Sequence, residues 1–375
     1  MPPTVLDAPD RPLKHSLYYF ASDEGGASAH DKRRLLFDSA RFADRHGFCA
    51  VWAPERHFHA FGGLSPNPSV TAAALAALTS NVRIRSGSVV LPLHAVARVA
   101  EEWALVDVLS GGRVDLGLAS GWFPNDFVLA PPGTYERRGE LLFERLEELR
   151  RLWRGDTFEA VNPLGDPVSL RTLPRPVQPE LPVWITAAGN PDTFRRAGSL
   201  GVNVLTHLLG QSLDALAEKI AVYRQAWAEA GHPGRGEIAL MLHAYVGEDD
   251  DAVRRTVRAP MLHYLASSAQ LVGRYTASVP FFQQRCAVDT GALTAQDVDD
   301  ALAFSFERYY QTSSLLGTVD DCLDRLDHMR AIGVDEIACL IDFGVPTDEV
   351  LAALPRLAEL FELANVSEAE LAAVA

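Results

Sequence analysis

Residues 82–119 read VRIRSGSVVLPLHAVARVAEEWALVDVLSGGRVDLGLA, and this stretch decides the fold class. It holds two largely apolar runs, Val82–Leu91 and Arg113–Ala119, which flank the amphipathic segment Ala95–Leu109. A strand, a helix and a strand in this order predict two parallel strands that are joined by a covering helix.

The same alternation continues along the chain. It predicts eight strands, at Ser16–Ala21, Ala50–Ala53, Val82–Leu91, Arg113–Ala119, Pro182–Ala187, Val202–Thr206, Ile238–Val246 and Glu336–Asp342. Amphipathic segments lie between them, at Lys32–Arg45, Ser69–Leu78, Ala95–Leu109, Gly139–Trp153, Pro191–Leu200, Leu213–Ala230 and Asp320–Ile332. Most strands are apolar on both faces, as expected where helices cover one face and a barrel core the other. The pattern predicts an α/β protein, a (β/α)8 TIM barrel. A Rossmann sheet is the alternative, but it requires GxGxxG after the first strand, where residues 18–26 offer only DEGG.

Two stretches interrupt the alternation. The proline-rich stretch 157–182 is expected to form an excursion with two short strands after strand 4. The stretch 261–314 follows strand 7, is longer and partly helical, and is expected to act as a lid, because insertions at the carboxyl ends of barrel strands commonly carry specificity. The whole chain, residues 1–375, is expected to form a single barrel domain.

Composition excludes several classes of protein. The net charge is −15, and residues 287–375 hold 18 acidic and 4 basic side chains, so no basic stripe is available for nucleic acid. No apolar run is long enough to span a membrane, and the first residues do not form a signal peptide. Four cysteines without CxxC spacing favour a reduced, cytoplasmic protein without disulfides or a zinc site.

Polar residues follow the barrel strands, where such barrels carry their chemistry. After strand 2, the run PERHFH includes Arg56 and His57, which could bind an anionic ring or move protons; the alternative is a solvated loop. Nothing in this run requires a metal ion. After strand 4, Ser120, Gly121 and Trp122 combine a turn with an aromatic wall, although aromatic residues more often belong to the core.

The remaining candidates suit a flat, phosphorylated ligand. Gly87 and Ser88 lie inside a Val-rich strand, which indicates a bulge, a close approach of ligand or simply tight packing. Gly189, Asn190 and Thr193 lie at the start of a helix, which would suit a phosphate or be an ordinary cap. His207 follows strand 6. The set favours a phosphorylated aromatic cofactor over the paired acids of a glycosidase or a GxSxG hydrolase.

Three long segments resemble the bacterial luciferase-like monooxygenase family. They are GFCAVWAPERHFHAFGGLSPNPSV, SGSVVLPLHAVARVAEEWALVDVLSGGRVDLGLASGW and LPVWITAAGNPDTFRRAGSLGVNVLTHLLG. The resemblance implies a (β/α)8 barrel, reduced FMN supplied by a separate flavin reductase, and a homodimer. The most similar subgroup oxygenates small or carrier-protein-bound intermediates of natural-product pathways.

The resemblance also assigns roles by position. The flavin contact on strand 3, often a non-prolyl cis peptide, falls on Gly87–Ser88, and the phosphate falls on Gly189, Asn190 and Thr193. Luciferases have two adjacent histidines where this chain has Arg56 and His57. We expect Arg56 to stabilise negative charge and His57 to shuttle protons. The alternatives are a deazaflavin-dependent hydride-transfer enzyme, a non-catalytic flavin-binding relative and a docking component of an assembly line.

Overall fold

A computed structural model describes residues 11–22, 27–275 and 295–366 of the chain. Eight parallel strands close into a barrel in the order β1–β2–β3–β4–β7–β8–β9–β11, and β11 pairs with β1. Their bounds are β1 (Lys14–Tyr18), β2 (Ala50–Ala53), β3 (Arg83–Val90), β4 (Val114–Ala119), β7 (Val183–Thr186), β8 (Asn203–His207), β9 (Ile238–Gly247) and β11 (Glu336–Leu340). The predicted TIM barrel is confirmed, and all eight predicted strands overlap the observed ones.

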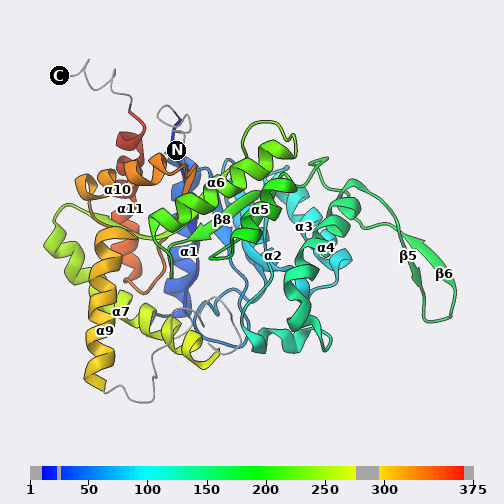
Figure 1. The fold of residues 1–375 in the computed structure, drawn as a ribbon, viewed down its shortest axis with the longest axis horizontal. Coiled ribbons are helices and arrows are strands. Elements are labelled where there is room, and N and C mark those ends of the chain that lie inside the picture. Colours follow the sequence, from blue (N-terminus) through cyan, green and yellow to red (C-terminus); the bar gives the residue numbers. More distant parts are fainter. Residues whose placement is uncertain (1–10, 23–26, 276–294, 367–375) are drawn as a thin grey trace.

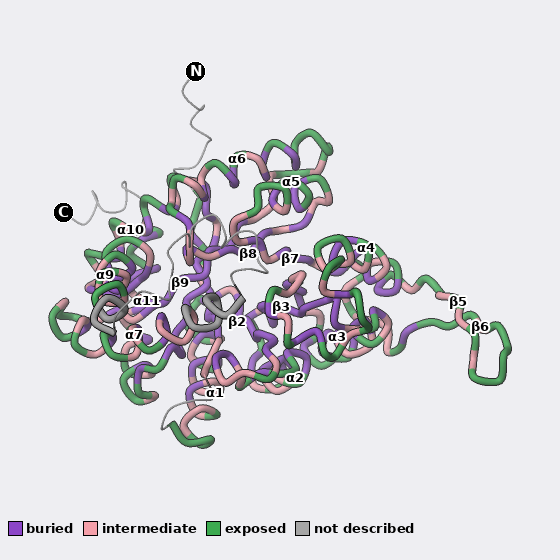
Figure 2. Tube along the Cα trace, turned by 60° about the horizontal axis from the view of Figure 1, so that its bottom comes forward, coloured by how far each residue is buried: buried purple, intermediate pink, exposed green. Residues whose placement is uncertain are grey.

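Helices surround the barrel (Figure 1). They are α1 (Ala29–Arg45), α2 (Pro68–Leu78), α3 (Val96–Ser110), α4 (Thr134–Arg154), α5 (Pro191–Ser199), α6 (Leu213–Glu229), α10 (Val319–Ala331) and α11 (Thr347–Ala364), with two 3-10 turns, η1 (Leu91–Leu93) and η2 (Pro124–Leu129). The buried residues follow the strands and the inner faces of these helices (Figure 2). The core therefore lies inside the barrel and between the strands and the helices.

The stretch that decided the fold class forms β3, α3 and β4. Strand β3 pairs in parallel with β4, with a register irregularity between Ser86 and Val89. Helix α3 ends at Gly111, whose φ of +70° is the left-handed conformation that glycine adopts without cost. The local turn chemistry thus stops the helix where the chain has to return to the barrel.

Charged side chains fill the part of the barrel interior near the amino ends of the strands, which we call the lower layer. Arg85 donates to Glu336 at 2.7 and 2.8 Å and to Asp115 at 2.6 Å. Its guanidinium packs against the rings of Trp52 and Trp184, at 4.7 and 4.5 Å from their centroids. All three charged groups are buried, so Glu336 depends on Arg85 for compensation of its charge, whereas Asp115 is paired with both Arg85 and Arg83.

The predicted insertion after strand 4 is an antiparallel hairpin of β5 (Phe158–Val161) and β6 (Pro167–Leu170). It projects away from the barrel as an arm (Figure 1). Leu164 at its tip is 85% exposed. The hairpin strands pair only with each other in the described part of the chain, so the arm is separate from the barrel sheet.

The predicted insertion after strand 7 contains helices α7 (Asp250–Tyr275) and α9 (Ala295–Thr312). Residues 276–294 of this insertion, including Cys286, lie outside the described residues. A short strand that the sequence did not predict, β10 (Leu315–Thr318), pairs with Ala244–Gly247 at the end of β9. Strand β9 is long enough to extend beyond the barrel, and its overhang accepts this extra strand.

Most element boundaries differ from the prediction by one or more residues, as β1 and α4 illustrate. Strand β1 begins at Lys14, two residues before the expected Ser16, and ends three residues before Ala21. Helix α4 begins at Thr134 rather than at Gly139. Cys49, Cys322 and Cys339 are free thiols. Among the described residues, no helix combines the length and the apolar character that crossing a bilayer requires.

Candidate functional site

The carboxyl ends of the barrel strands gather the residues that the sequence singled out. Arg56 and His57 follow β2, Gly87 and Ser88 lie in β3, and Ser120–Trp122 follow β4. Gly189, Asn190 and Thr193 follow β7, and His207 ends β8. All of them therefore lie at one end of the barrel, the end at which barrel enzymes carry their chemistry.

Arg56 forms a buried contact with the loop that follows β4. Its Nη1 donates to Asp126 Oδ2 at 3.0 Å. Its guanidinium lies 4.1 Å from the ring centroid of Phe123 and 5.2 Å from that of Trp122. Burial raises the pKa of Asp126 to about 6, although the charge of Arg56 acts in the opposite direction. The structure thus joins two sequence candidates, Arg56 and Trp122, in one cluster.

His57 belongs to a second cluster, which is centred on the buried carboxylate of Glu55. Oε1 of Glu55 lies 2.7 Å from Nε2 of His57 and 2.7 Å from Nε2 of His94. Oε2 accepts from the Val90 N–H at 2.8 Å. Burial acts to raise the pKa of Glu55, but the hydrogen bonds from both imidazoles outweigh it and lower the pKa. Burial likewise opposes charging of His94, yet its bond to Glu55 raises its pKa.

The Glu55 cluster also has the composition of a metal site. Its three ligand atoms lie within 4.8 Å of one another. The two N···O separations of 2.7 Å, however, are ordinary hydrogen-bond distances. The geometry is that of a carboxylate that orients two imidazoles, and it fixes which ring atom of His57 faces the protein.

Gly87 and Ser88 form a fixed platform. The peptide bond between them is cis, as the resemblance implied. The Tyr18 hydroxyl donates to the Gly87 carbonyl, and the hydroxyls of Ser88 and Thr186 are hydrogen-bonded. A Cβ at Gly87 would lie 2.7 Å from Cε2 of Tyr18, so only glycine fits at this approach.

The end of β4 supplies a turn and a partly exposed ring. Gly121 has a φ of +78°, and a Cβ there would lie 2.7 Å from Val90 Cγ1. Its carbonyl accepts from Arg138 Nε at 3.2 Å. Ser120 is half-buried, and Trp122 keeps 37% of its surface exposed. Trp122 is therefore the member of this segment that is open to solvent and in contact with Arg56.

Helix α5 begins as the sequence predicted. Asn190 is its N-cap, and its side-chain oxygen accepts from the Asp192 N–H at 3.0 Å. Gly189 and Thr193 on either side are half-buried. Next to them on β8, burial lowers the pKa of His207 to about 4, and its Nδ1 accepts from the Leu209 N–H at 3.2 Å.

Sequence reasoning missed several polar residues at this end of the barrel. Glu55 and Asp126 stand inside runs that were considered, and His94 ends the quoted strand-3 run LPLH, so density of polar residues could have found them. His243 on β9 and Asp342 after β11 are single polar residues in apolar strands. Burial raises the pKa of Asp342 to about 7, opposed by its bond from the Phe20 N–H at 2.8 Å.

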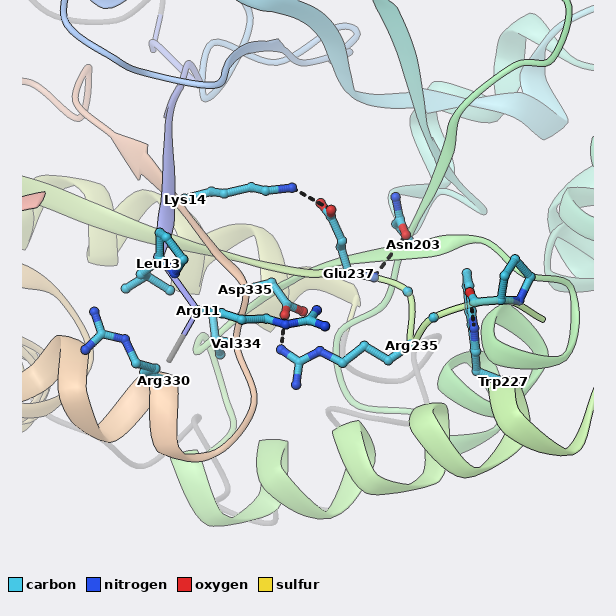
Figure 3. Close-up of a pocket in the computed structure, with 14 residues that line it drawn as sticks. Arg11, Leu13, Lys14, Asn203, Trp227, Arg235, Glu237, Arg330, Val334 and Asp335 are labelled. Carbon is cyan, nitrogen blue, oxygen red and sulfur yellow. Dashed lines mark hydrogen bonds and ion pairs between the residues drawn. The ribbon is translucent and has the colours of Figure 1, made fainter. Parts of the chain in front are cut away.

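The opposite end of the barrel holds a polar cavity of about 350 Å³ (Figure 3). Its walls include Lys14, Asn203, Glu237 and Asp335, which lie where strands begin. Lys14 pairs with Glu237 at 2.5 Å, and Asp335 pairs with Arg235 and Arg224. The charges there bind one another, and residues at this end of a barrel contribute to stability rather than to chemistry.

Two curated relatives cover most of the chain. The oxygenase component of the flavin-dependent trigonelline monooxygenase of Acinetobacter baylyi is 26% identical over 326 residues, covering 86% of this chain and 87% of that protein. The 4-hydroxyprotoasukamycin monooxygenase of Streptomyces nodosus subsp. asukaensis is 27% identical over 306 residues, covering 78% and 76%. Both are named as monooxygenases.

Solved structures share the fold. Monooxygenase RslO1 of Streptomyces bottropensis has a TM-score of 0.73 at 22% identity, covering 94% of this chain and all of that one. The FMN complex of the 3,6-diketocamphane monooxygenase oxygenating constituent from Pseudomonas putida has 0.71 at 18%, covering 93% and 98%. The coenzyme F420 dependent tetrahydromethanopterin reductase of Methanopyrus kandleri has 0.67 at 15%, covering 93% and 99%. The sequence profile of the luciferase-like monooxygenase family matches residues 16–336. The chain belongs to the luciferase-like monooxygenase family.

Proposed function

We propose that this protein is the oxygenase component of a two-component flavin-dependent monooxygenase. It would use reduced FMN, supplied by a separate flavin reductase, and O2 to oxygenate a small or carrier-protein-tethered natural-product intermediate. The observation that carries the proposal is the pair of buried clusters around Arg56 and Glu55, next to the Gly87–Ser88 platform at the strand ends. The names of the two curated relatives support the same reaction class.

The residues at the strand ends fit a flavin. The backbone of Gly87 and Ser88, which is held by the hydroxyls of Tyr18 and Thr186, would lie against the flavin ring. Ser120, Gly121 and Trp122 would border the ring. The half-buried Gly189 and Thr193 would meet the phosphate at the start of α5, where Asn190 holds the first turn, and His207 would lie beside them. Reduced flavin, when bound, supplies the electrons that activate O2.

The chain itself would manage charge, protons and water. Arg56 is 3% exposed and can stabilise negative charge that develops near its guanidinium, because a buried cation acts through a low dielectric. His57 is held by Glu55 with its other ring nitrogen available for a proton. Trp122 and Phe123 cover Arg56 and limit the access of water.

We further propose that the whole chain acts as one barrel unit and pairs into a homodimer. Val70 on α2 and Leu105 and Leu109 on α3 are apolar and exposed, and these two helices pack against each other. Apolar side chains gathered on neighbouring helices suit contact with a second copy. Sedimentation of the wild type and of a Leu105→Glu, Leu109→Glu variant tests this: the wild type should be dimeric and the variant monomeric.

The cofactor is tested by titration under anaerobic conditions. We expect the protein to bind reduced FMN more tightly than a reduced deazaflavin, and to consume O2 when reduced FMN and a candidate substrate are present. Tighter binding of the deazaflavin without O2 consumption would favour hydride transfer instead. FMN binding with no oxygenated product from any substrate would favour a non-catalytic relative. Binding of a carrier protein without binding of flavin would favour a docking component.

Arg56→Met and His57→Gln separate binding from chemistry. Both should retain FMN, because Gly87, Ser88 and the start of α5 are unchanged. Oxygenation should fall by about 100-fold in each variant, the usual contribution of a group that stabilises charge or transfers a proton. Glu140→Gln on the exposed face of α4 is the matched control and should keep full activity.

A further inference from the structure

His243 has no role in the site described so far, although it is fully buried. Neither Nδ1 nor Nε2 has a hydrogen-bond partner in the described part of the chain. A buried polar atom without a partner loses the hydrogen bonds that it made to water in the unfolded state, so native proteins rarely retain one without a use. A hydrophobic residue of the same size would pack there without that loss.

The side chain of His243 points into the barrel. His243 is the parallel partner of Leu340 on β11, so both side chains lie on the same face of the sheet. Glu336 lies four residues before Leu340 on the same strand and therefore shares that face. Because Glu336 contacts Arg85 inside the barrel, His243 also faces the interior, two inward-facing positions nearer the carboxyl ends of the strands.

Aromatic rings surround the imidazole edge to face. The centroids of Tyr264 on α7, Phe343 after β11 and Tyr309 on α9 lie 4.4, 5.3 and 5.6 Å from that of His243. Burial, and then the neighbouring His207, lower the pKa of His243 to about 3. The imidazole is therefore neutral at physiological pH, with one nitrogen that donates and one that accepts.

Tyr264 and His207 near this aromatic compartment are also uncharged at neutral pH, whereas Asp342 is about half ionised there. Burial raises the pKa of the Tyr264 hydroxyl well above its ordinary value and lowers that of His207 to about 4. Asp342, which precedes Phe343, has its pKa raised to about 7 by burial. Arg56, the buried cation at the strand ends, is paired with Asp126 in a different cluster. The compartment thus offers aromatic faces, neutral polar atoms and one carboxyl group that is partly ionised at neutral pH.

We propose that His243 recognises the substrate: it hydrogen-bonds the hydroxyl of an uncharged, planar, unsaturated molecule, a phenol or enol, that lies among Tyr264, Tyr309 and Phe343. A hydroxyl both donates and accepts, which matches the two ring nitrogens, and a conjugated ring matches the aromatic walls. A carboxylate would meet no charged partner at the imidazole and would lose its hydration. This inference rests on the proposed monooxygenase function, since it assigns the substrate side of that site.

The test uses 4-cyanophenol as the probe, at a pH where it is neutral. Its binding is compared with that of 4-cyanoanisole, which lacks the donor, and 4-cyanobenzoate, which is charged. Wild type should bind the phenol at least tenfold more tightly than either analogue. His243→Phe should lose at least tenfold in phenol affinity, and His243→Gln, which keeps a donor and an acceptor, should lose less. Equal phenol affinity in wild type and His243→Phe, or equal affinity for phenol and benzoate, would overturn the proposal.

Two further measurements separate this result from other failures. FMN affinity should be the same in all three proteins, so a loss of FMN binding would bear on the proposed function and not on His243. Without a probe, His243→Phe should melt at the wild-type temperature or above, whereas a packing role would lower it. Should His243→Phe fail to fold, the nitrogen-15 resonances of His243 in the wild type decide: they should shift on addition of the phenol and stay fixed on addition of the anisole.

Discussion

The two polar layers inside the barrel differ in how their groups are partnered. In the lower layer, Arg85, Asp115 and Glu336 are charged and bind one another at 2.6–2.8 Å. In the upper layer, His243 is neutral and lacks a protein partner in the described residues, while the Asp342 carboxyl group accepts only from backbone N–H groups, including that of Phe20. Polar groups that find all their partners within one layer stabilise the fold. Polar groups that lack such partners are available to bind a ligand.

The same difference separates the two ends of the barrel. The cavity at the amino ends of the strands is surrounded by ion pairs such as Lys14–Glu237, and its charges are already used (Figure 3). The carboxyl ends carry a guanidinium under two aromatic rings and the imidazole of His243, which has no partner among the described residues. The cavity at the amino ends therefore does not mark the functional site. Whether the polar groups at each end of the barrel have protein partners is the better guide.

The lower layer should give the largest stability effect. Arg85→Met leaves Glu336 buried without its cation, while Asp115 keeps Arg83, so the free energy of unfolding should fall by about 3–5 kcal/mol. Denaturant unfolding measures it. Arg98→Met, which breaks the exposed Arg98–Glu102 pair, is the control and should cost less than about 1 kcal/mol. Arg85→Met, Glu336→Met should be more stable than Arg85→Met alone. A cost for Arg85→Met as small as that of the control would show that the layers do not differ.

A substitution in the Glu55 cluster should give the second-largest effect, on the pKa of a histidine. In Glu55→Gln the bond that raises the pKa of His94 loses its charge, while the burial that lowers it remains. The pKa of His94 should therefore fall below its value in the wild type. An NMR titration of the imidazoles measures the change, with Glu140→Gln as the control. An unchanged titration of His94 would mean that Glu55 does not hold it.

Asp342 in the upper layer should make the free energy of unfolding depend on pH. Burial raises its pKa to about 7 in the folded state, above its ordinary value, so folding favours the protonated form. The stabilisation is complete below the unfolded pKa, near 4, and is lost as the pH rises through about 7. Between these limits the unfolding free energy of the wild type should fall relative to that of Asp342→Asn by at least about 1 kcal/mol.

The comparison with Asp342→Asn isolates this group. His207 and His243 have lowered pKa values, so their contribution is lost as the pH falls toward about 4 and 3, in the opposite direction. Both histidines are present in both proteins and cancel in the difference. Asp348→Asn at the exposed start of α11 is the matched control. Parallel curves for the wild type and Asp342→Asn would contradict the assignment.

The sequence was sufficient for the barrel because each strand shows its own apolar pattern. Strand β2, Ala50–Ala53, was placed at its observed bounds, and the insertions after strands 4 and 7 were recognised as interruptions of that pattern. Strand β10 was missed because LLGT is short and depends on the overhang of β9, which no local pattern reveals.

The site was predicted only as far as single segments allow. Arg56 and His57 were found from their own run, but each cluster is completed from elsewhere in the chain: Asp126 is 70 residues after Arg56, and His94 is 39 residues after Glu55. Such pairs form only when the barrel closes. His243 was missed for the related reason that its importance lies in lacking a partner, and a sequence does not show which polar residues of a strand remain unpaired.

The smallest expected effect compares one serine from each layer. In the lower layer, Ser16 donates to Glu336 at 2.6 Å and accepts from Trp52 Nε1 at 2.9 Å. Ser16→Ala removes a fully buried bond to a charge and should cost about 1 kcal/mol. In the upper layer, Ser88→Ala leaves only the Thr186 hydroxyl, which is half-buried and can turn to water, so it should cost about 0.5 kcal/mol or less.

Denaturant unfolding of both variants under one condition decides the order, and FMN binding adds an independent readout. Ser16→Ala should leave FMN affinity unchanged, because it lies a layer below the platform. Ser88→Ala should weaken FMN binding while barely changing stability. The opposite result would be that Ser88→Ala lowers the free energy of unfolding more than Ser16→Ala and leaves FMN affinity unchanged. The residues at the carboxyl ends of the strands would then serve the fold, and the basis for assigning the ligand to that end would be lost.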